Sequence, residues 1–141
     1  MANMLASFES RNSLGAYGEL YASKLLSKLA SIRCASVHHR KYAGDIKAIT
    51  SNGAILRVEV KTATLSTYDN KFHFTLKKKG HTDCKFTDFV VLLCVVDFAL
   101  VIPFIIPTKD IANLRAIAIT RNPQAYAGKY AKYRHNWSAI S

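Results

Sequence analysis

Acidic residues are scarce in this sequence. Its 141 residues include nine Asp and Glu against twenty Lys and Arg, which gives a formal net charge of +11 and a pI near 9.8. A compact domain this basic repels itself unless a polyanion offsets the charge, and nucleic acid is the commonest such partner. A merely soluble basic protein is the alternative. An anionic membrane is disfavoured, because the sequence contains no long basic amphipathic helix.

Paired cysteines, a signal sequence and repeats are also lacking. The three cysteines are odd in number and show no CxxC spacing, which argues against a zinc knuckle or a disulfide framework and favours a reducing cytoplasm. The amino terminus has no basic region followed by an apolar run, so we expect no signal peptide. Because no linker-like segment interrupts the chain, the sequence predicts a single domain over residues 1–141.

One apolar run, from Phe89 to Ile106, is long enough to suggest a membrane span. Asp97 lies in the middle of the run and Pro103 breaks it, while Val, Ile and Phe dominate its composition. Two buried strands joined by a turn explain these features better than a membrane helix. We therefore expect strands over Asp88–Val96 and Leu100–Ile106.

The rest of the pattern predicts one long helix, several strands and short terminal helices. Ser13 is the expected N-cap of an amphipathic helix that runs to about residue 30. This order indicates an α/β or α+β fold in which helices flank a mixed central β-sheet. The further strands are expected at Ile32–Val37, Gly44–Thr50, Ala54–Thr62, Lys71–Leu76 and Arg115–Ile119, and the short helices at Thr108–Leu114 and Ala125–Trp137.

The three residues Ser51-Asn52-Gly53 are a strong turn signal between two of these strands. If they form the loop and Gly53 is left-handed, the register of the hairpin follows. One face is then apolar, as a buried face requires. The pairs on that face are Ile46 with Val58, Ala48 with Leu56 and Thr50 with Ala54, and the other face carries Asp45 opposite Glu59, Lys47 opposite Arg57, and Lys61 beyond Glu59.

The two acids on the polar face, Asp45 and Glu59, are candidate metal ligands. Carboxylates directly opposite each other repel, so folding alone gains nothing from Asp45 facing Glu59. A divalent cation makes the arrangement favourable, since Mg²⁺ is typically held by one or two carboxylates together with phosphate oxygens and water. Lys61 beside such an ion is placed to hold or deprotonate a water, or to stabilise charge on a phosphate. The alternative is a solvated face on which Asp45 pairs with Lys47 or Lys61.

These residues resemble the PD-(D/E)XK nuclease superfamily, whose signature is an acidic residue on one strand and Glu-x-Lys on the next. Here the two parts read Gly44-Asp45-Ile46 and Glu59-Val60-Lys61. Glu19 matches a further acid of the family's leading helix, although a favourable charge in the first helical turns is an equal interpretation. Gly44 replaces the proline of the family name, and no clear long helix follows Lys61, which leaves the connectivity of the sheet open.

The resemblance, which spans residues 15 to about 106, implies a restriction-endonuclease-like fold and hydrolysis of phosphodiester bonds in double-stranded DNA. It implies that Asp45 and Glu59 bind one or two Mg²⁺ ions with the Val60 carbonyl, and that Lys61 acts on the water. Glu19 would be a further catalytic residue. Because two strands need two active sites, we expect a homodimer or tetramer. A site-specific, homing-type endonuclease is favoured over a restriction enzyme; a Holliday-junction resolvase and a non-catalytic nucleic-acid-binding module are the alternatives.

Basic residues around this site are expected to bind DNA. Arg40 and Lys41 lie just before Asp45, where they would lead the backbone into the site. The other expected phosphate contacts are Lys47, Arg57, Lys77, Lys78, Lys79, His81 and Lys85, with a solvated loop as the alternative for the last five.

An aromatic stripe lies near the carboxyl terminus. Its members recur at helical spacing between basic residues: Tyr126, Tyr130, Tyr133 and Trp137. Such a stripe indicates either core packing or a platform on which bases stack, and core packing is favoured.

Overall fold

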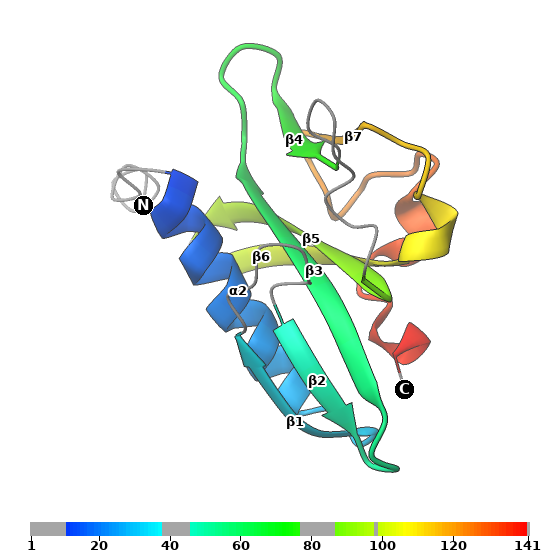
Figure 1. Ribbon diagram of the computed structural model, residues 1–141. Coiled ribbons are helices and arrows are strands. Elements are labelled where there is room, and N and C mark those ends of the chain that lie inside the picture. The colour runs from blue at the N-terminus through cyan, green and yellow to red at the C-terminus, as the bar shows by residue number, and fades with distance from the viewer. Residues whose placement is uncertain (1–10, 38–45, 77–86, 98, 141) are drawn as a thin grey trace.

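The computed structural model describes residues 11–37, 46–76, 87–97 and 99–140. A five-stranded sheet in the order β1-β2-β3-β5-β6 forms the centre, and a second sheet pairs β4 with β7 (Figure 1). This mixed α+β arrangement confirms the predicted fold class. The elements are α2 (Arg11–Ser27), β1 (Ile32–Val37), β2 (Ile46–Thr50), β3 (Ile55–Thr64), β4 (Lys71–Thr75), β5 (Phe89–Asp97), β6 (Leu100–Pro107) and β7 (Ala116–Thr120), with 3₁₀ turns η1 (Thr108–Asp110), η2 (Ala131–Tyr133) and η3 (Trp137–Ala139).

The central sheet is mixed in direction. β1, β2 and β3 pair antiparallel, β3 and β5 pair parallel, and β5 and β6 pair antiparallel. Between the two parallel strands the chain passes through β4, which belongs to the second sheet. The resemblance places a crossover helix in this connection, whereas its described part contains β4. The strand order therefore answers the question of connectivity that the sequence left open.

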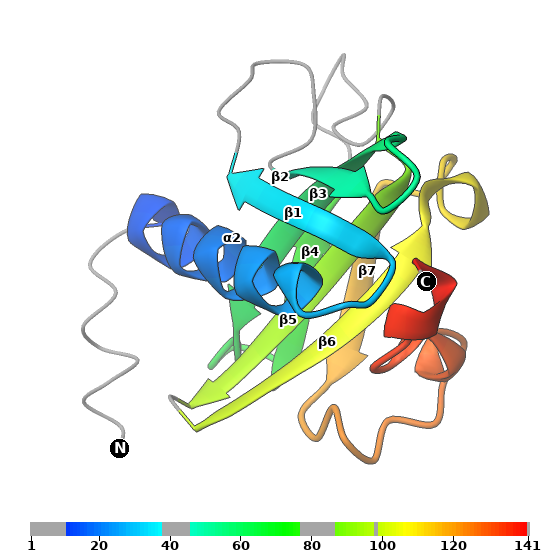
Figure 2. The ribbon, with the colours of Figure 1, turned by 90° about the horizontal axis from the view of Figure 1, so that it is seen from below.

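Each face of the central sheet has its own hydrophobic core. α2 covers one face, where Ala22 and Leu26 pack with Ile46 and Val58. The β4–β7 pair covers part of the other face, to which β3 contributes Ala63. Figures 1 and 2 show α2 and the β4–β7 pair on opposite sides of the sheet. Successive residues of β5 enter the two cores alternately, which explains why its sequence is a continuous apolar run.

The run from Phe89 to Ile106 forms β5 and β6, as predicted. Both strands are almost completely buried, with Asp97 at the turn between them. In the described part of the chain, no helix has the length and apolar character needed to cross a membrane.

The expected helix over Ala125–Trp137 is wrong, because the segment consists of turns and two short 3₁₀ elements. His135 has a φ of 55°, which an α-helix does not allow. The Arg134 guanidinium donates to the backbone oxygens of Pro123 and Tyr126, at 2.9 and 2.6 Å, and so fixes a compact loop. The expected helix over Thr108–Leu114 is likewise only the single turn η1.

The aromatic stripe nevertheless packs into the protein, which confirms the core interpretation. Tyr133 is buried, and Tyr126 and Tyr130 pack beside it against the core under β4 and β7. Trp137 packs against the other core, on the side of α2. A helical spacing in the sequence therefore corresponds to a loop that serves both cores.

Two glycines of α2 give a sharp test of its packing. A Cβ on Gly18 would lie 2.9 Å from the Cβ of Thr62 on β3 and would collide with the Thr62 hydroxyl, whereas a Cβ on Gly15 would meet nothing within 4 Å. We expect Gly18→Ala to lower the free energy of unfolding by about 1–3 kcal/mol, because overpacking strains a close contact. Gly15→Ala should raise it by about 0.5–1 kcal/mol, because alanine favours a helix interior. Urea unfolding measures both.

The close contact between α2 and β3 predicts a specific compensation. Thr62→Ala removes the hydroxyl that a new side chain at Gly18 would meet, so it should restore part of the stability lost in Gly18→Ala. Similar effects of alanine at Gly15 and Gly18, or no compensation, would contradict this packing.

Candidate active site

The β2–β3 hairpin has the predicted register. Ile46 pairs with Val58, and Lys47 pairs with Arg57. Gly53 has a φ of 89°, the left-handed conformation that the turn requires. Asp45 would continue β2 by one residue, opposite Glu59, but it lies outside the described residues. The pairing of Asp45 with Glu59 therefore stays a prediction.

Hydrogen bonds around Arg57 show whether position 59 of β3 is a hydrogen-bonded or a non-hydrogen-bonded position of the hairpin. The Arg57 amide donates to Asp88 Oδ2 at 2.9 Å, and the Arg57 carbonyl accepts from the Asp88 amide at 2.8 Å. The backbone of Arg57 therefore points away from β2. Directions alternate along a strand, so the amide and carbonyl of Glu59 also point towards β5, and those of Val60 towards the β2 edge.

Position 59 is thus a non-hydrogen-bonded position of the hairpin. Opposing Cα atoms at such positions are only about 4.5 Å apart, and their side chains approach each other more closely than in hydrogen-bonded pairs. A carboxylate on β2 opposite Glu59 would consequently be near it, with the Val60 carbonyl at the same edge.

Glu59 and Lys61 lie together on one face of β3. Lys61 Nζ is 3.3 Å from Glu59 Oε1, and the two side chains are 21% and 10% exposed, respectively. The same face carries Ala63, which packs under the β4–β7 pair. An acid held this far from water needs a cation beside it, and Lys61 supplies one. Their shared face agrees with the sequence analysis, and their catalytic roles stay predictions.

Glu19 is half-buried in α2. Its neighbour Gly18 lies against Thr62, which follows Lys61 in β3. α2 therefore brings Glu19 to the part of β3 that carries the Glu-x-Lys sequence. The helix covers the face of the sheet opposite to Glu59 and Lys61. A catalytic Glu19 would therefore have to reach past the edge of β3, at the residues of β3 that extend beyond Ile46, the first described residue of β2.

Most of the expected DNA contacts lie outside the described residues: Arg40, Lys41, Lys77, Lys78, Lys79, His81 and Lys85. Lys47 and Arg57 are described, and both are half-buried on the face of Glu59. Within the described ranges, His, Cys, Asp and Glu form no group of three or more that would hold a metal ion. The predicted acid pair therefore depends on Asp45.

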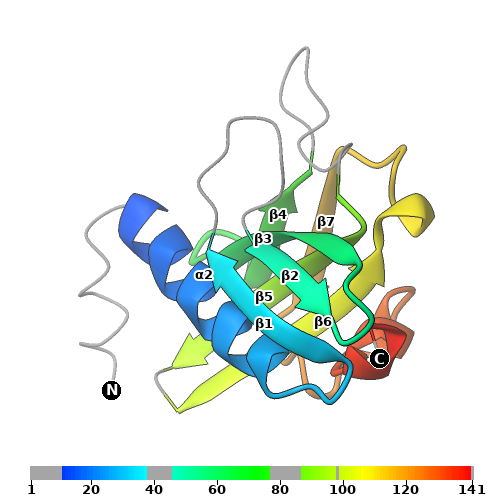
Figure 3. The same ribbon diagram turned by 60° about the horizontal axis from the view of Figure 1, so that its bottom comes forward.

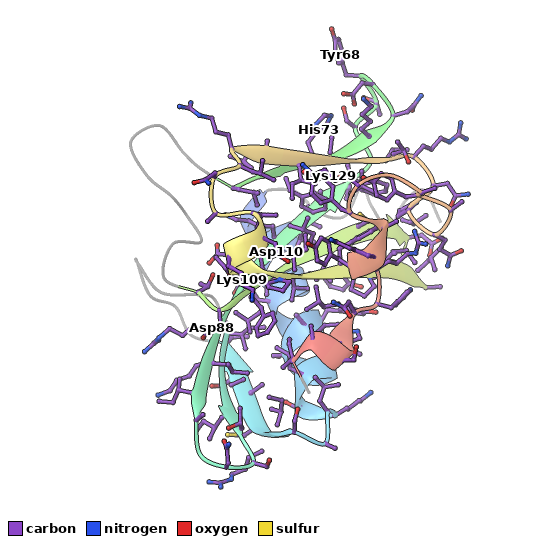
Figure 4. The ribbon with its side chains drawn as sticks, turned by 90° about the vertical axis from the view of Figure 1, so that its right-hand side faces the viewer. Tyr68, His73, Asp88, Lys109, Asp110 and Lys129 are labelled. Carbon is purple, nitrogen blue, oxygen red and sulfur yellow. The ribbon has the colours of Figure 1, made fainter. Side chains whose placement is uncertain are left out.

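The sequence analysis missed the structural role of Asp88. This exposed residue lies where the hairpin joins the rest of the sheet (Figure 4). Its backbone and carboxylate both bond to the backbone of Arg57, and its carbonyl accepts from the Thr108 amide at 3.0 Å. Asp88 thus fixes β3 two residues before Glu59. The sequence feature that could have predicted this role is the position of Asp88 directly before an apolar strand.

Comparisons with known proteins concern the fold. No family model matches the chain, and no curated protein does. Among solved structures, it is similar to a bacterial homing endonuclease, I-Ssp6803I, with a TM-score of 0.72 and 15% identity over 93% of each chain. The two chains share a fold. A crystal structure of MepB matches with a TM-score of 0.44 and 12% identity, over 86% of this chain and 92% of that one.

Proposed function

We propose that this protein is a Mg²⁺-dependent, site-specific endonuclease that hydrolyses phosphodiester bonds in double-stranded DNA, in the manner of a homing endonuclease. The observation that carries the proposal is the Glu59–Lys61 pair on β3. The β2–β3 register, if it continued by one residue, would place Asp45 opposite Glu59. The net charge of +11 favours a polyanionic substrate. The shared fold with a homing endonuclease is consistent with this activity.

The proposed metal ligands are all oxygen atoms. Asp45 and Glu59 would supply carboxylates and Val60 its carbonyl, a hard donor set that suits Mg²⁺ and leaves positions for phosphate oxygens and water. The weakly exposed Glu59 carboxylate has little hydration to lose on binding. A bound ion would offset the negative charge of the phosphate and lower the pKa of a water.

Lys61 is the proposed catalytic cation. Its ammonium group, held beside Glu59 at 3.3 Å, is positioned to orient the attacking water or to donate a hydrogen bond to the phosphate as negative charge builds on its oxygens. Glu19 would assist from the edge of β3. Two such sites, one for each DNA strand, require a dimer or a larger symmetric assembly.

Three DNA substrates test the proposal: a linear duplex pool of mixed sequence, a four-way junction and single-stranded DNA, each with Mg²⁺ or with EDTA. We expect cleavage of the linear duplex at discrete positions, and only with Mg²⁺. Cleavage confined to the junction would identify a Holliday-junction resolvase instead of a homing-type endonuclease. Salt-sensitive binding without cleavage of any substrate would reject the catalytic assignment and identify a binding module.

A further inference from the structure

On the side of the sheet away from α2, the strands β1, β2 and β3 share a face next to Glu59. β1, β2 and β3 lie side by side at one end of the sheet (Figure 3). Their registers align the side chains of this face in two rows across the three strands. We call the two rows together the hairpin face: the apolar row is Cys34, Ile49 and Ile55, and the cationic row is Ser36, Lys47 and Arg57.

The apolar row contributes to neither hydrophobic core. In the described part of the chain, the cores include the residues between these positions, such as Ala48 and Leu56, but not Ile49 or Ile55. α2 packs on the reverse side of these strands. Ile55 is 49% exposed, although the solvated face of an antiparallel sheet is ordinarily polar. An apolar row with exposed members, Cys34 and Ile55, favours contact with a partner.

The cationic row points to a negatively charged partner. Lys47 and Arg57 oppose each other at a non-hydrogen-bonded position, where like charges destabilise the hairpin. An anion between them would remove that repulsion. Arg57 precedes Glu59 by two residues, a distance of about 6.6 Å along a strand. That distance is close to the spacing of successive phosphates in a nucleic acid backbone.

We propose that the hairpin face binds the DNA that flanks the cleaved bond. Lys47 and Arg57 hold the phosphate next to the one at Glu59, and Ile49 and Ile55 contact apolar parts of the DNA beyond it. Deoxyribose carbons and the thymine methyl group in the major groove are the apolar surfaces that a duplex offers to a two-stranded ribbon. This inference rests on the proposed function for the location of the cut.

Salt dependence separates the two rows. Binding of a mixed-sequence duplex is measured in EDTA over a range of salt concentrations. Because each phosphate contact contributes about 0.9 to the slope of log K against log salt, and Lys47 and Arg57 share one phosphate, the double variant Lys47→Gln/Arg57→Gln should reduce the slope by about that amount. Each single variant should reduce it by a part of that amount. Ile49→Ser and Ile55→Ser should weaken binding about fivefold without changing the slope, because they remove only apolar contact.

Matched controls are available on α2, behind the sheet. Lys24→Gln removes an exposed cation, and Leu20→Ser changes a side chain that is 52% exposed, close to the 49% of Ile55. Neither should alter affinity or slope beyond the weak long-range effect of one charge. Equal effects of the α2 and hairpin variants, or unchanged slopes in both cationic-row variants, would overturn the proposal.

Cys34 provides an independent probe in the native sequence of this face. It is an exposed free thiol, whereas Cys94 is buried and burial raises the pKa of its thiol, so it reacts slowly. In a Cys84→Ser background, duplex DNA should slow the alkylation of Cys34 by iodoacetamide several-fold. Unchanged alkylation at saturating DNA would overturn the proposal.

The two proposals fail in different ways. Mg²⁺-dependent cleavage together with unaltered binding by the hairpin variants would reject the hairpin face and leave the nuclease assignment intact. Slope changes and Cys34 protection without any cleavage would support the hairpin face as a DNA-binding surface and reject catalysis.

Discussion

A Lys61→Ala variant is expected to lose DNA cleavage by at least about a hundredfold while it retains most of its affinity for duplex DNA. The removal of a positioned group that stabilises charge or transfers a proton typically lowers a rate by about 10² to 10⁴. Lys61 is only 21% exposed and lies against Glu59, so it offers little surface for general DNA binding. Single-turnover cleavage with Mg²⁺ and binding in EDTA measure the two effects separately.

Lys71→Ala is the matched control for Lys61→Ala. Lys71 is an exposed lysine at the start of β4, so its removal changes the net charge equally. Urea unfolding of both variants shows whether the Glu59 carboxylate, left without its ammonium partner, destabilises the fold. Near-normal cleavage by a folded Lys61→Ala variant would remove Lys61 from the mechanism.

An Asp45→Asn variant is expected to lose both cleavage and the stabilisation of the fold by Mg²⁺. An ion that binds only the folded state stabilises it by about 2.7 kcal/mol at a concentration of a hundred times Kd. In EDTA the variant should be at least as stable as the unaltered protein, because one of two repelling carboxylates has lost its charge. Thermal unfolding with and without Mg²⁺ reports both changes, and cleavage assays report the activity.

Asp69→Asn supplies the control for the acid pair. Asp69 lies before β4 and pairs with His73 at 2.7 Å, and His73 lies in Figure 4 at the opposite end of the molecule from the hairpin. This variant should respond to Mg²⁺ like the unaltered protein. An equal loss of Mg²⁺ stabilisation in both variants, or full stabilisation of Asp45→Asn, would argue against a metal site at Asp45 and Glu59.

Local signals predicted much of the fold. The turn Ser51-Asn52-Gly53 and the alternation of side chains fixed the hairpin register, since turn chemistry and the burial of one face agreed. The interrupted apolar run gave β5 and β6 for the same reason. The pairing of β4 with β7 had no such signal, because forty residues separate two strands that meet only in the folded protein.

The candidate site was likewise predictable only where local sequence determines it. The common face of Glu59 and Lys61 follows from their separation by two residues in a strand. The bonds of Asp88 to Arg57 and the contact of Gly18 with Thr62 depend on how distant elements pack, which no local pattern encodes. The C-terminal aromatic residues misled for a related reason, since their helical spacing arose in a loop held by Arg134.

The alternation along β3 constrains how this chain can change in length. Val58 and Val60 belong to the core under α2, while Glu59, Lys61 and Ala63 occupy the reverse side. A one-residue insertion or deletion between Arg57 and Glu59 would turn the charged side chains into the apolar core and expose the valines. Homologous proteins should therefore vary in chain length only in the loops that connect this strand, and not within it.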